Sequence, residues 1–548
     1  MDPDYIVIGA GSSGCVVANR LSGPGGGTVL LLEAGGSSRG MLFRMPMAAS
    51  KLWFNPKSSW CLWSEPEPAL DGRRIPVPRG KALGGSSAIN GTIFNRGSPH
   101  DFDQWADFGL KGWDAASVLP YFKRIETNWR GADAHHGGGG EVPVTPLRSR
   151  SPLTPPFLAA AREKGLPVID DFTGPLPEGV GLADVNVSRS GRRMSSADAF
   201  LWPVRHRKTL RVETGAQVLK IRVEESRAVE VVYLQNGQTH VARAQREIIL
   251  SAGAVHSPHM LLCSGIGPAD ELKRVGVKPV HDLAGVGRNF NDQPGASFEF
   301  RSKLPLTLQH HLRIDRLAFN IARWGLGLGG PASGPPLVGI GSLRTNYGNR
   351  SPDLRFVLAA ATMDSKIWWP GIDTPGEHKL MMRFAVAHPV SRGSITLGSS
   401  DPLESPRILF NLLQDSSDME RLKSYYRTLV DLIRQPAFSK VAGDIVRPSP
   451  EPESDQDLER YLRSVAETTM HSMGSCRMGE DTDAVVDGEC RVHGLSGLRV
   501  VDASVFPTQI SGNPNATAMM LGERASEMIL GRSPTPKMSS GVASPPPR

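Results

Sequence analysis

Short apolar runs that end in small residues mark the start of the chain. Residues 5–14 read YIVIGAGSSG, an apolar strand that leads directly into Gly9, Gly11 and Gly14. Residues 12–22 (SSGCVVANRLS) then place apolar side chains at helical spacing. Glycines in this pattern allow a tight turn, a close approach of the backbone to a ligand, and close packing of helix on strand. The pattern predicts a strand, a glycine turn and a helix whose N-terminus can face a phosphate.

A second apolar run follows the predicted helix. Residues 28–35 (TVLLLEAG) are apolar up to Glu33, which lies 19 residues after Gly14 (33 − 14). A carboxylate at the end of this second strand can accept hydrogen bonds from ribose hydroxyls. Strand, turn, helix and acid in this order predict a dinucleotide site.

Two later apolar runs have the form of further strands in the same sheet. Residues 246–258 (REIILSAGAVHSP) end in small residues, and residues 498–507 (LRVVDASVFP) pass from an apolar strand to Asp502. An acidic group at a strand end could hold the hydroxyls of a ribityl chain. Segments more than 200 residues apart in the chain would then contribute strands to one sheet. This favours FAD, the longer dinucleotide, over NAD.

The glycine fingerprints disappear between about residues 300 and 466. Residues 354–361 (LRFVLAAA) and 379–389 (KLMMRFAVAHP) predict strands of a second sheet, and residues 418–435 predict an amphipathic helix. A chain of 548 residues is longer than one core usually organises, so we expect two lobes. The predicted division is 1–299 for the first part of the cofactor domain, 300–466 for the second domain, 467–531 for the return to the cofactor domain, and 532–548 for a disordered tail rich in Pro and Ser.

Composition narrows the class of protein. The formal net charge of +7 comes from scattered Lys and Arg, which does not favour a nucleic-acid partner. No run of 18 apolar residues occurs and the first strand pattern begins at residue 5, so we expect no transmembrane segment, no secretory leader and a cytoplasmic location. Five cysteines without CxxC and fourteen histidines without HExxH predict reduced thiols and no metal site.

Two signature stretches carry a family resemblance. Residues 78–97 (PRGKALGGSSAINGTIFNRG) and 253–267 (GAVHSPHMLLCSGIG) resemble the two signatures of the glucose–methanol–choline (GMC) oxidoreductases. The resemblance runs from about residue 4 to residue 531 and includes residues 391–408, 468–479 (TTMHSMGSCRMG) and 502–520. It implies an α/β fold in which a Rossmann-like FAD-binding domain is interleaved with an α+β substrate-binding domain built on an antiparallel sheet.

The resemblance also implies a set of cofactor-binding residues. Gly84–Ser87 have almost no side-chain bulk, so a flat ring system can lie against their backbone. Family members with a covalently attached flavin carry a histidine directly before Asn90; here the residue is Ile89, which implies non-covalent FAD. The residues expected to bind FAD are Gly9, Gly11, Ser12, Ser13, Gly14, Glu33, Ala34, Trp63, Gly84, Gly85, Ser86, Asn90, Gly91, Thr92, Ile93, Val218, Ala252, Asp502, Ala503, Pro514 and Asn515.

The family's catalytic pair maps onto His471 and Asn513. An imidazole can act as a base near neutral pH without a metal, and an amide can hydrogen-bond a developing alkoxide while flavin accepts the hydride. A histidine among small residues can also be purely structural. Asn513 precedes Pro514 and an apolar helical stripe, which also fits a helix N-cap. Asn515 is the alternative for the amide role.

The expected reaction is the FAD-dependent oxidation of a primary alcohol to an aldehyde, with electrons passed to O2 or to a quinone-type or other acceptor. The alternative is a flavoprotein lyase or photoenzyme on the same scaffold. Ala88 disfavours the photoenzyme, whose corresponding loop carries a cysteine. Candidates for lining an apolar substrate entrance are Trp60, Trp63, Phe94, Trp368 and Trp369.

Overall fold

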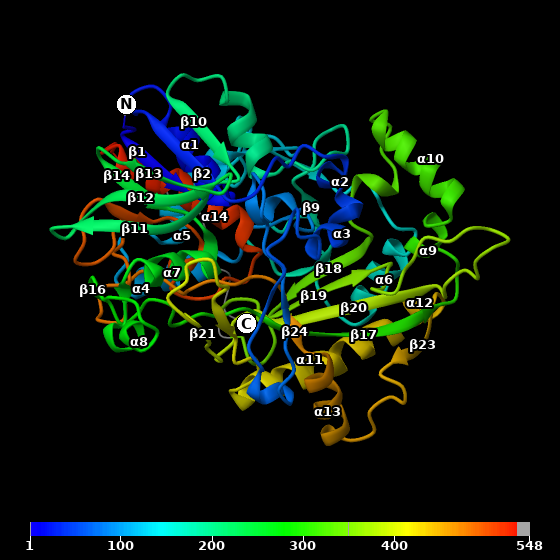
Figure 1. The fold of residues 1–548 in the computed structure, drawn as a ribbon. Coiled ribbons are helices and arrows are strands. Elements are labelled where there is room, and N and C mark those ends of the chain that lie inside the picture. The colour runs from blue at the N-terminus through cyan, green and yellow to red at the C-terminus, as the bar shows by residue number, and fades with distance from the viewer. Residues whose placement is uncertain (1, 349, 534–548) are drawn as a thin grey trace.

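A computed structural model describes residues 2–348 and 350–533 of the chain. The predicted disordered tail, 532–548, lies outside these residues except for its first two positions. Figure 1 shows two sheets side by side, a short parallel sheet near the N-terminus and a larger antiparallel sheet across the molecule.

The first sheet has five parallel strands. In spatial order they are β10 (Leu210–Thr214), β2 (Val29–Glu33), β1 (Tyr5–Ile8), β14 (Glu247–Leu250) and β25 (Leu498–Val500). The runs at 246–258 and 498–507 therefore do return to the nucleotide-type sheet, as their sequence pattern predicted. β1, β2 and β25 are buried at every position, which explains why they are nearly uninterrupted apolar runs.

Two helices bring the ends of the chain together against this sheet. α1 (Ser12–Leu21) follows β1, and α14 (Pro514–Ile529) packs along it. The contact is close because Gly522 has no side chain: a Cβ there would lie 2.8 Å from the Ser13 carbonyl oxygen. This packing places the N-terminal ends of both helices beside the ends of the strands.

The second sheet is antiparallel and has seven strands. In order they are β23 (Ala442–Arg447), β17 (Pro294–Ser302), β20 (Lys379–Val386), β19 (Leu354–Ala359), β18 (Leu337–Leu343) and β8 (Gly179–Gly181), with β24 (Glu467–Thr468) also paired to β17. The strands predicted at 354–361 and 379–389 are confirmed as β19 and β20. The predicted domain boundaries stay a prediction; β17 runs through position 299/300.

The two faces of the antiparallel sheet differ. On β19, Leu354, Phe356 and Leu358 are buried in a core shared with α11 (Ser416–Arg434), the helix predicted at 418–435. Figure 1 shows α11 along one face of this sheet. Side chains alternate along a strand, so Arg355 and Val357 lie on the opposite face. That face closes one side of the site described below.

The remaining elements connect and cover the two sheets. A three-stranded antiparallel sheet is formed by β11 (Gln217–Glu224), β12 (Arg227–Gln235) and β13 (Gln238–Arg243). Other helices are α2 (Met41–Arg44), α3 (Ala49–Trp53), α4 (Pro99–Asp107), α5 (Ala115–Ile125), α6 (Thr154–Glu163), α7 (Gly253–Cys263), α8 (Ala269–Arg274), α9 (Leu308–His311), α10 (Ile314–Gly325), α12 (Pro436–Ser439) and α13 (Asp455–Val465). Other strands are β3 (Leu62–Trp63), β4 (Pro76–Val77), β5 (Ile93–Phe94), β6 (Glu126–Asn128), β7 (Val142–Pro146), β9 (Asp184–Val185), β15 (Ile266–Gly267), β16 (His281–Asp282), β21 (Ser394–Thr396) and β22 (Arg407–Leu409). Over residues 2–348 and 350–533, no helix has both the length and the apolar character needed to cross a bilayer.

Candidate active site

A cavity lies at the carboxyl ends of the parallel strands, where open parallel sheets bind their ligands. Its walls come from the turn after β1, the end of β2, the 85–93 loop, the turn after β14, and the segments that follow β24 and β25. The predicted site residues that line it are Gly9, Gly11, Ser12, Ser13, Glu33, Ala34, Gly85, Ser86, Asn90, Gly91, Thr92, Ile93, Val218, Ala252, His471, Asp502, Ala503, Asn513, Pro514 and Asn515.

Three predicted cofactor residues do not line this cavity. Gly14 packs α1 against the turn, since a Cβ there would lie 2.0 Å from the Gly9 carbonyl oxygen. Gly84 donates its backbone N–H to the Ala10 carbonyl and so joins the two glycine-rich loops. Trp63 lies on β3 with 54% of its surface exposed.

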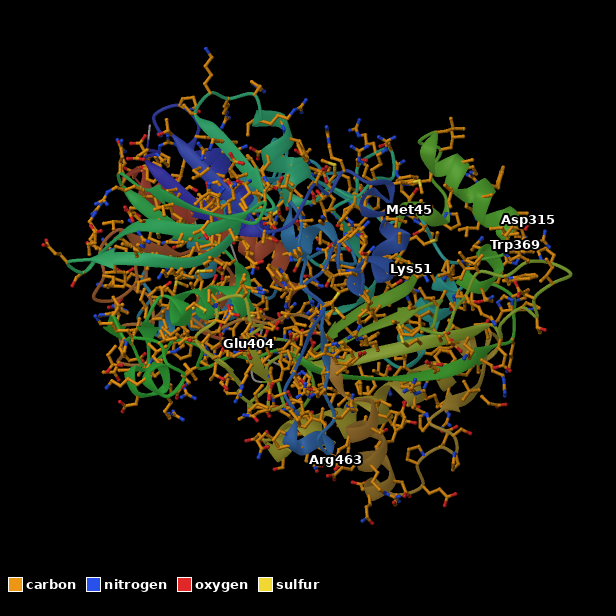
Figure 2. The ribbon with its side chains drawn as sticks, in the orientation of Figure 1. Met45, Lys51, Asp315, Trp369, Glu404 and Arg463 are labelled. Carbon is orange, nitrogen blue, oxygen red and sulfur yellow. The ribbon has the colours of Figure 1, made fainter. Side chains whose placement is uncertain are left out.

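Most of the aromatic candidates do not line the cavity. Trp60 lines it, whereas Phe94, Trp368 and Trp369 are not among the described residues that do. In Figure 2, Trp369 and Asp315 lie together at the outer edge of the molecule, far from Glu404 of the cavity wall. Trp60 is therefore the aromatic candidate that the fold brings to the site.

The cavity walls fit a flavin dinucleotide. α1 begins after Gly11, which has no side chain to cap the helix, so the first backbone N–H groups of α1 can bind a pyrophosphate. A Cβ on Gly85 would lie 2.8 Å from the Gly11 Cα, so only bare backbone lets these two loops meet. The N-terminus of α14 faces the same cavity and favours negative charge there.

Two buried carboxylates stand at strand ends in this cavity. Glu33 accepts hydrogen bonds from the backbone N–H of Ala10 (2.9 Å) and of Gly35 (2.8 Å), and burial raises its pKa to about 7. Asp502 accepts from the Gly253 N–H (2.9 Å) and the Ser257 hydroxyl (2.5 Å), and burial raises its pKa as well. Both acids thus shape the turns around the cavity in addition to facing it.

His471 is oriented by Gln293. The Gln293 amide nitrogen donates to the backbone carbonyls of Ala387 (3.1 Å) and Ile510 (2.9 Å), which leaves the amide oxygen facing His471 Nδ1 at 2.8 Å. An amide oxygen only accepts, and the Asn513 amide nitrogen faces Nε2, so these two contacts place the imidazole proton on Nδ1. Arg355 Nη1 lies 3.3 Å from Nδ1 and donates instead to Gln293 Oε1 at 3.0 Å. The other ring nitrogen, Nε2, is then an unprotonated acceptor.

Asn513 is oriented in the same way by Arg355. It is the N-cap of α14, with Pro514 at the first helical position as predicted, but its side chain turns away from the helix. Arg355 Nη2 donates to Asn513 Oδ1 at 2.6 Å, which leaves Asn513 Nδ2 facing His471 Nε2 at 3.2 Å. The alternative residue, Asn515, accepts a hydrogen bond from Ser12 at 2.7 Å and ties α14 to α1.

Three arginines set the electrostatics around the histidine. Burial, and then Arg355, Arg383 and Arg79, hold the pKa of His471 well below its usual value. Arg79 is paired with the buried carboxylate of Asp292 at 3.6 Å. Asp292 also accepts the backbone N–H of His471 at 3.0 Å, so this ion pair holds the histidine loop in place.

A second, smaller cavity lies on the side of the antiparallel sheet. His471, Asn513 and Ile93 line both cavities, so the catalytic pair predicted from the sequence stands between them. The second cavity has a volume of about 150 Å³, and Gln293, Arg355, Arg383 and Thr469 also line it. It is suited to a small molecule that reaches the histidine from the side opposite the dinucleotide.

Four residues around the histidine were not predicted: Gln293, Arg355, Arg79 and Asp292. The sequence did contain a signal for Arg355. It is the charged residue within the apolar run LRFVLAAA, so its side chain is expected on the strand face opposite the apolar core. Gln293 and Asp292 lie in an irregular segment before β17, where no periodicity points to them.

Comparisons with known proteins agree with this geometry. Family models described as GMC oxidoreductase match residues 3–295 and 389–522. The chain is 39% identical over 540 residues to an oxygen-dependent choline dehydrogenase of Chromohalobacter salexigens, an alignment that covers 98% of this chain and 96% of that protein. The chain belongs to the GMC oxidoreductase family. This GMC oxidoreductase is also 37% identical to an oxygen-dependent choline dehydrogenase of Vibrio vulnificus, over 98% of this chain and 96% of the other.

Solved structures of GMC-fold enzymes superpose on nearly the whole chain. Pyridoxine 4-oxidase from "Mesorbium loti" has a TM-score of 0.86 at 27% identity, covering 96% of this chain and 98% of its own. Formate oxidase of Aspergillus oryzae has a TM-score of 0.89 at 25% identity, covering 97% and 99%. The predicted family, fold class and FAD cofactor are confirmed, and the protein is an FAD-dependent oxidoreductase of the alcohol-oxidising type.

Two finer predictions have different outcomes. The relatives reported above are dehydrogenases and oxidases, so the lyase or photoenzyme alternative has no support. Non-covalent attachment of FAD stays a prediction. Ile89, the residue on which it rests, is buried and packs with Leu52 and Ala88.

Proposed function

We propose that this GMC oxidoreductase converts a primary alcohol to the aldehyde, with His471 as general base and Asn513 as hydrogen-bond donor to the alcohol oxygen. One observation carries the proposal: His471 Nε2 and Asn513 Nδ2 face each other at 3.2 Å on the wall that both cavities share. An alcohol oxygen within hydrogen-bond distance of both nitrogens can lose its proton to Nε2 and accept a hydrogen bond from Nδ2.

The base role of His471 is supported by its proton and its pKa. With the proton on Nδ1 held by Gln293, Nε2 is free to accept the hydroxyl proton. Because the pKa lies well below 6.5, the imidazole is neutral throughout the physiological range. The hydroxyl proton thus moves to Nε2 as the C–H bond breaks.

Charge on the alcohol oxygen is stabilised by a donor whose direction is fixed in advance. Arg355 holds Asn513 Oδ1, so Asn513 Nδ2–H points toward the reacting oxygen without reorganisation. The guanidinium adds a positive charge behind this amide. Bound FAD supplies the hydride acceptor.

For the electron acceptor we propose O2 or a quinone-type molecule. The relatives are named as oxygen-dependent dehydrogenases and as an oxidase, which supports O2 as one of the two. Either acceptor would take the two electrons that the alcohol leaves on the flavin.

The test is anaerobic mixing of the purified yellow enzyme with a panel of primary alcohols, followed by admission of air. Bleaching of the flavin absorbance together with formation of an aldehyde is the expected result. Fast recolouring in air identifies an oxidase, and slow recolouring that a quinone accelerates identifies a dehydrogenase. A flavin that no alcohol bleaches, in protein with full FAD content, would overturn the proposal.

A further inference from the structure

The cavity on the antiparallel-sheet side carries an unusual charge for an alcohol site. Two arginines, Arg355 and Arg383, line it, and no Asp or Glu is among the described residues that do. We propose that the alcohol oxidised here is a small hydroxy acid whose anionic group binds Arg383, with Arg355 adding positive charge beside it. This inference rests on the proposed alcohol oxidation and names the substrate class for the same site.

The strand register puts both guanidinium groups on one face. On neighbouring strands Arg355 pairs with Ala385, and Val357 pairs with Arg383. Arg355 and Arg383 are therefore diagonal neighbours on the same side of the sheet, within mutual reach of long side chains. The opposite side of both strands carries the apolar core against α11, so the two charges are directed at the cavity and its catalytic pair.

Arg355 is a buried cation without a counter-ion. Among the described residues no carboxylate lies within 4.0 Å of its guanidinium. Its polar neighbours are neutral: oxygens of Asn513, Gln293 (3.0 Å) and Gly512 (3.1 Å), and His471 Nδ1 at 3.3 Å. Burial lowers the pKa of Arg355 to about 10, and the more distant Asp101 offsets this only in part. A buried charge is costly unless it is paired, so the site favours an anion.

Arg383 has a hydrogen-bond donor without a partner among the described residues. Its Nη2 donates to the Thr468 carbonyl (2.6 Å) and meets the Glu467 carboxylate at 3.1 Å, whereas its buried Nε has no partner among the described residues. The Glu467 side chain is 38% exposed, so it can turn into solvent when another carboxylate arrives. A guanidinium N–H without a protein partner can donate a charge-assisted hydrogen bond to a carboxylate oxygen.

The size of the cavity limits the acid. A volume of about 150 Å³ is close to that of an apolar cavity known to hold benzene, so the ligand has on the order of six to eight non-hydrogen atoms. An ω-hydroxy acid of three to five carbons has that size, with its hydroxyl at His471 and its carboxylate at Arg383. Choline is the substrate named for the two dehydrogenase relatives, and it would bring a quaternary ammonium next to two guanidinium groups.

The first experiment measures binding without turnover. Butyrate and its neutral analogue butyramide are titrated into the oxidised holoenzyme while the flavin absorbance is followed. We expect butyrate to bind about 10- to 100-fold more tightly than butyramide, which is the usual size of a charge-assisted contact. Equal affinities for the acid and the amide would overturn the proposal.

Variants assign the effect to Arg383. R383M should bring the acid-to-amide ratio of affinities close to one, while E467Q, which removes the competing carboxylate, should raise it. The matched control R301M changes an arginine of β17 that pairs with Glu377 outside the cavity, and it should leave the ratio unchanged. If R383M cannot be purified, E467Q alone tests the proposal. An acid-to-amide ratio of affinities that does not rise in E467Q contradicts it.

Turnover separates this inference from the proposed function. We expect kcat/KM for 4-hydroxybutyrate to exceed that for 4-hydroxybutyramide and for choline by at least about 10-fold. If choline or the amide is oxidised as well as the acid, the substrate class is wrong while alcohol oxidation stands. If none of a wide panel of alcohols reduces the flavin although butyrate binds selectively, the oxidation proposal fails and the anion site stands.

Discussion

At the scale of single residues, the site depends on side-chain amide groups whose orientation is fixed by further hydrogen bonds. Gln293 is held by two backbone carbonyls and in turn holds Nδ1 of His471. Arg355 holds the oxygen of Asn513 and so directs its N–H at His471 Nε2. The lone pair and the N–H donor that we propose act on an alcohol therefore have one orientation each.

Replacement of His471 should slow flavin reduction strongly and leave FAD binding intact. His471→Ala removes the proton acceptor, so we expect the rate of flavin reduction by alcohol to fall about 10²- to 10⁴-fold. FAD content should equal that of the wild type, because the dinucleotide cradle comes from other segments. Stopped-flow reduction measures the rate, with His240→Ala on β13 as a matched control. Reduction at the wild-type rate would show that another group takes the proton.

Gln293 is a positioning residue that can be tested by pH as well as by rate. Gln293→Leu removes the amide acceptor and leaves only the Thr469 hydroxyl, 3.0 Å from Nδ1, so we expect kcat to fall about 10- to 100-fold, as for other residues that orient an imidazole. Gln293→Glu keeps an acceptor but adds a negative charge, so it should raise the pKa of His471 and move the acid limb of the kcat/KM profile to higher pH. A profile that stays in place would argue against contact between the two side chains.

The pH dependence follows from the depressed pKa of His471. In the folded protein the imidazole stays neutral below pH 6.5, so kcat/KM should hold its plateau through pH 6.5 and decline only at lower pH. The unfolded chain binds the proton at the usual pKa, which makes the folded state less stable as pH falls below about 6.5. His471→Ala should therefore lose less of its melting temperature between pH 7 and 5 than the wild type does. An acid limb centred at or above pH 6.5 would contradict this account.

At the scale of elements, the site is assembled by helix N-termini and by strand register. α1 and α14 are more than 490 residues apart in sequence, yet Ser12 and Asn515 hydrogen-bond at their ends, because the helices pack together over Gly522. β19 and β20 place Arg355 and Arg383 on the cavity face through alternation and pairing. A shift of one residue in either strand would turn the arginine of that strand into the apolar core.

The turn after β1 can be tested with a single methyl group. A Cβ on Gly14 would lie 2.0 Å from the Gly9 carbonyl oxygen, so Gly14→Ala should displace α1, cost about 1–3 kcal/mol of stability and lower FAD occupancy. In the control Gly36→Ala, the added Cβ has nothing within 4 Å and both properties should be kept. Thermal denaturation and the ratio of flavin to protein absorbance give the two readouts. Equal occupancy in the two variants would show that the close packing of this turn is not needed.

At the scale of the whole molecule, the dinucleotide cavity and the smaller cavity meet at His471 and Asn513. The parallel sheet supplies the cofactor side and the antiparallel sheet supplies the other side. Segments that follow β24 and β25, one from each sheet, carry the histidine and the asparagine. Neither sheet forms the site alone.

Release of the cofactor tests how FAD is held across this cavity. Since Ile89 stands where a covalent linkage would need histidine, acid precipitation should release the yellow FAD into the supernatant. The FAD-free protein should gain thermal stability when FAD is added back, because a ligand that binds only the folded state stabilises it. A yellow pellet after precipitation would show a covalent bond.

Features that depend on contiguous residues were determined by the sequence itself. The glycine turn after β1, the helix that starts at Pro514, the strands at 354–361 and 379–389 and the helix at 418–435 all follow from periodicity and turn chemistry within one segment. Most residues that the family motifs assign to the cofactor line one cavity. Trp63 lies outside that cavity, exposed on β3, and no pattern around it indicates which face of this short strand is covered.

What only the tertiary structure decided is how distant segments orient one another. Arg355 reaches Gln293 across 62 positions, His471 across 116 and Asn513 across 158. Such contacts depend on strand pairing and on loops without periodicity, which leave no pattern in a single sequence. The sequence alone therefore determined the cofactor fold and pointed to His471 and Asn513. The tautomer of His471, the direction of the Asn513 amide and the charge of the second cavity came from residues brought together in space.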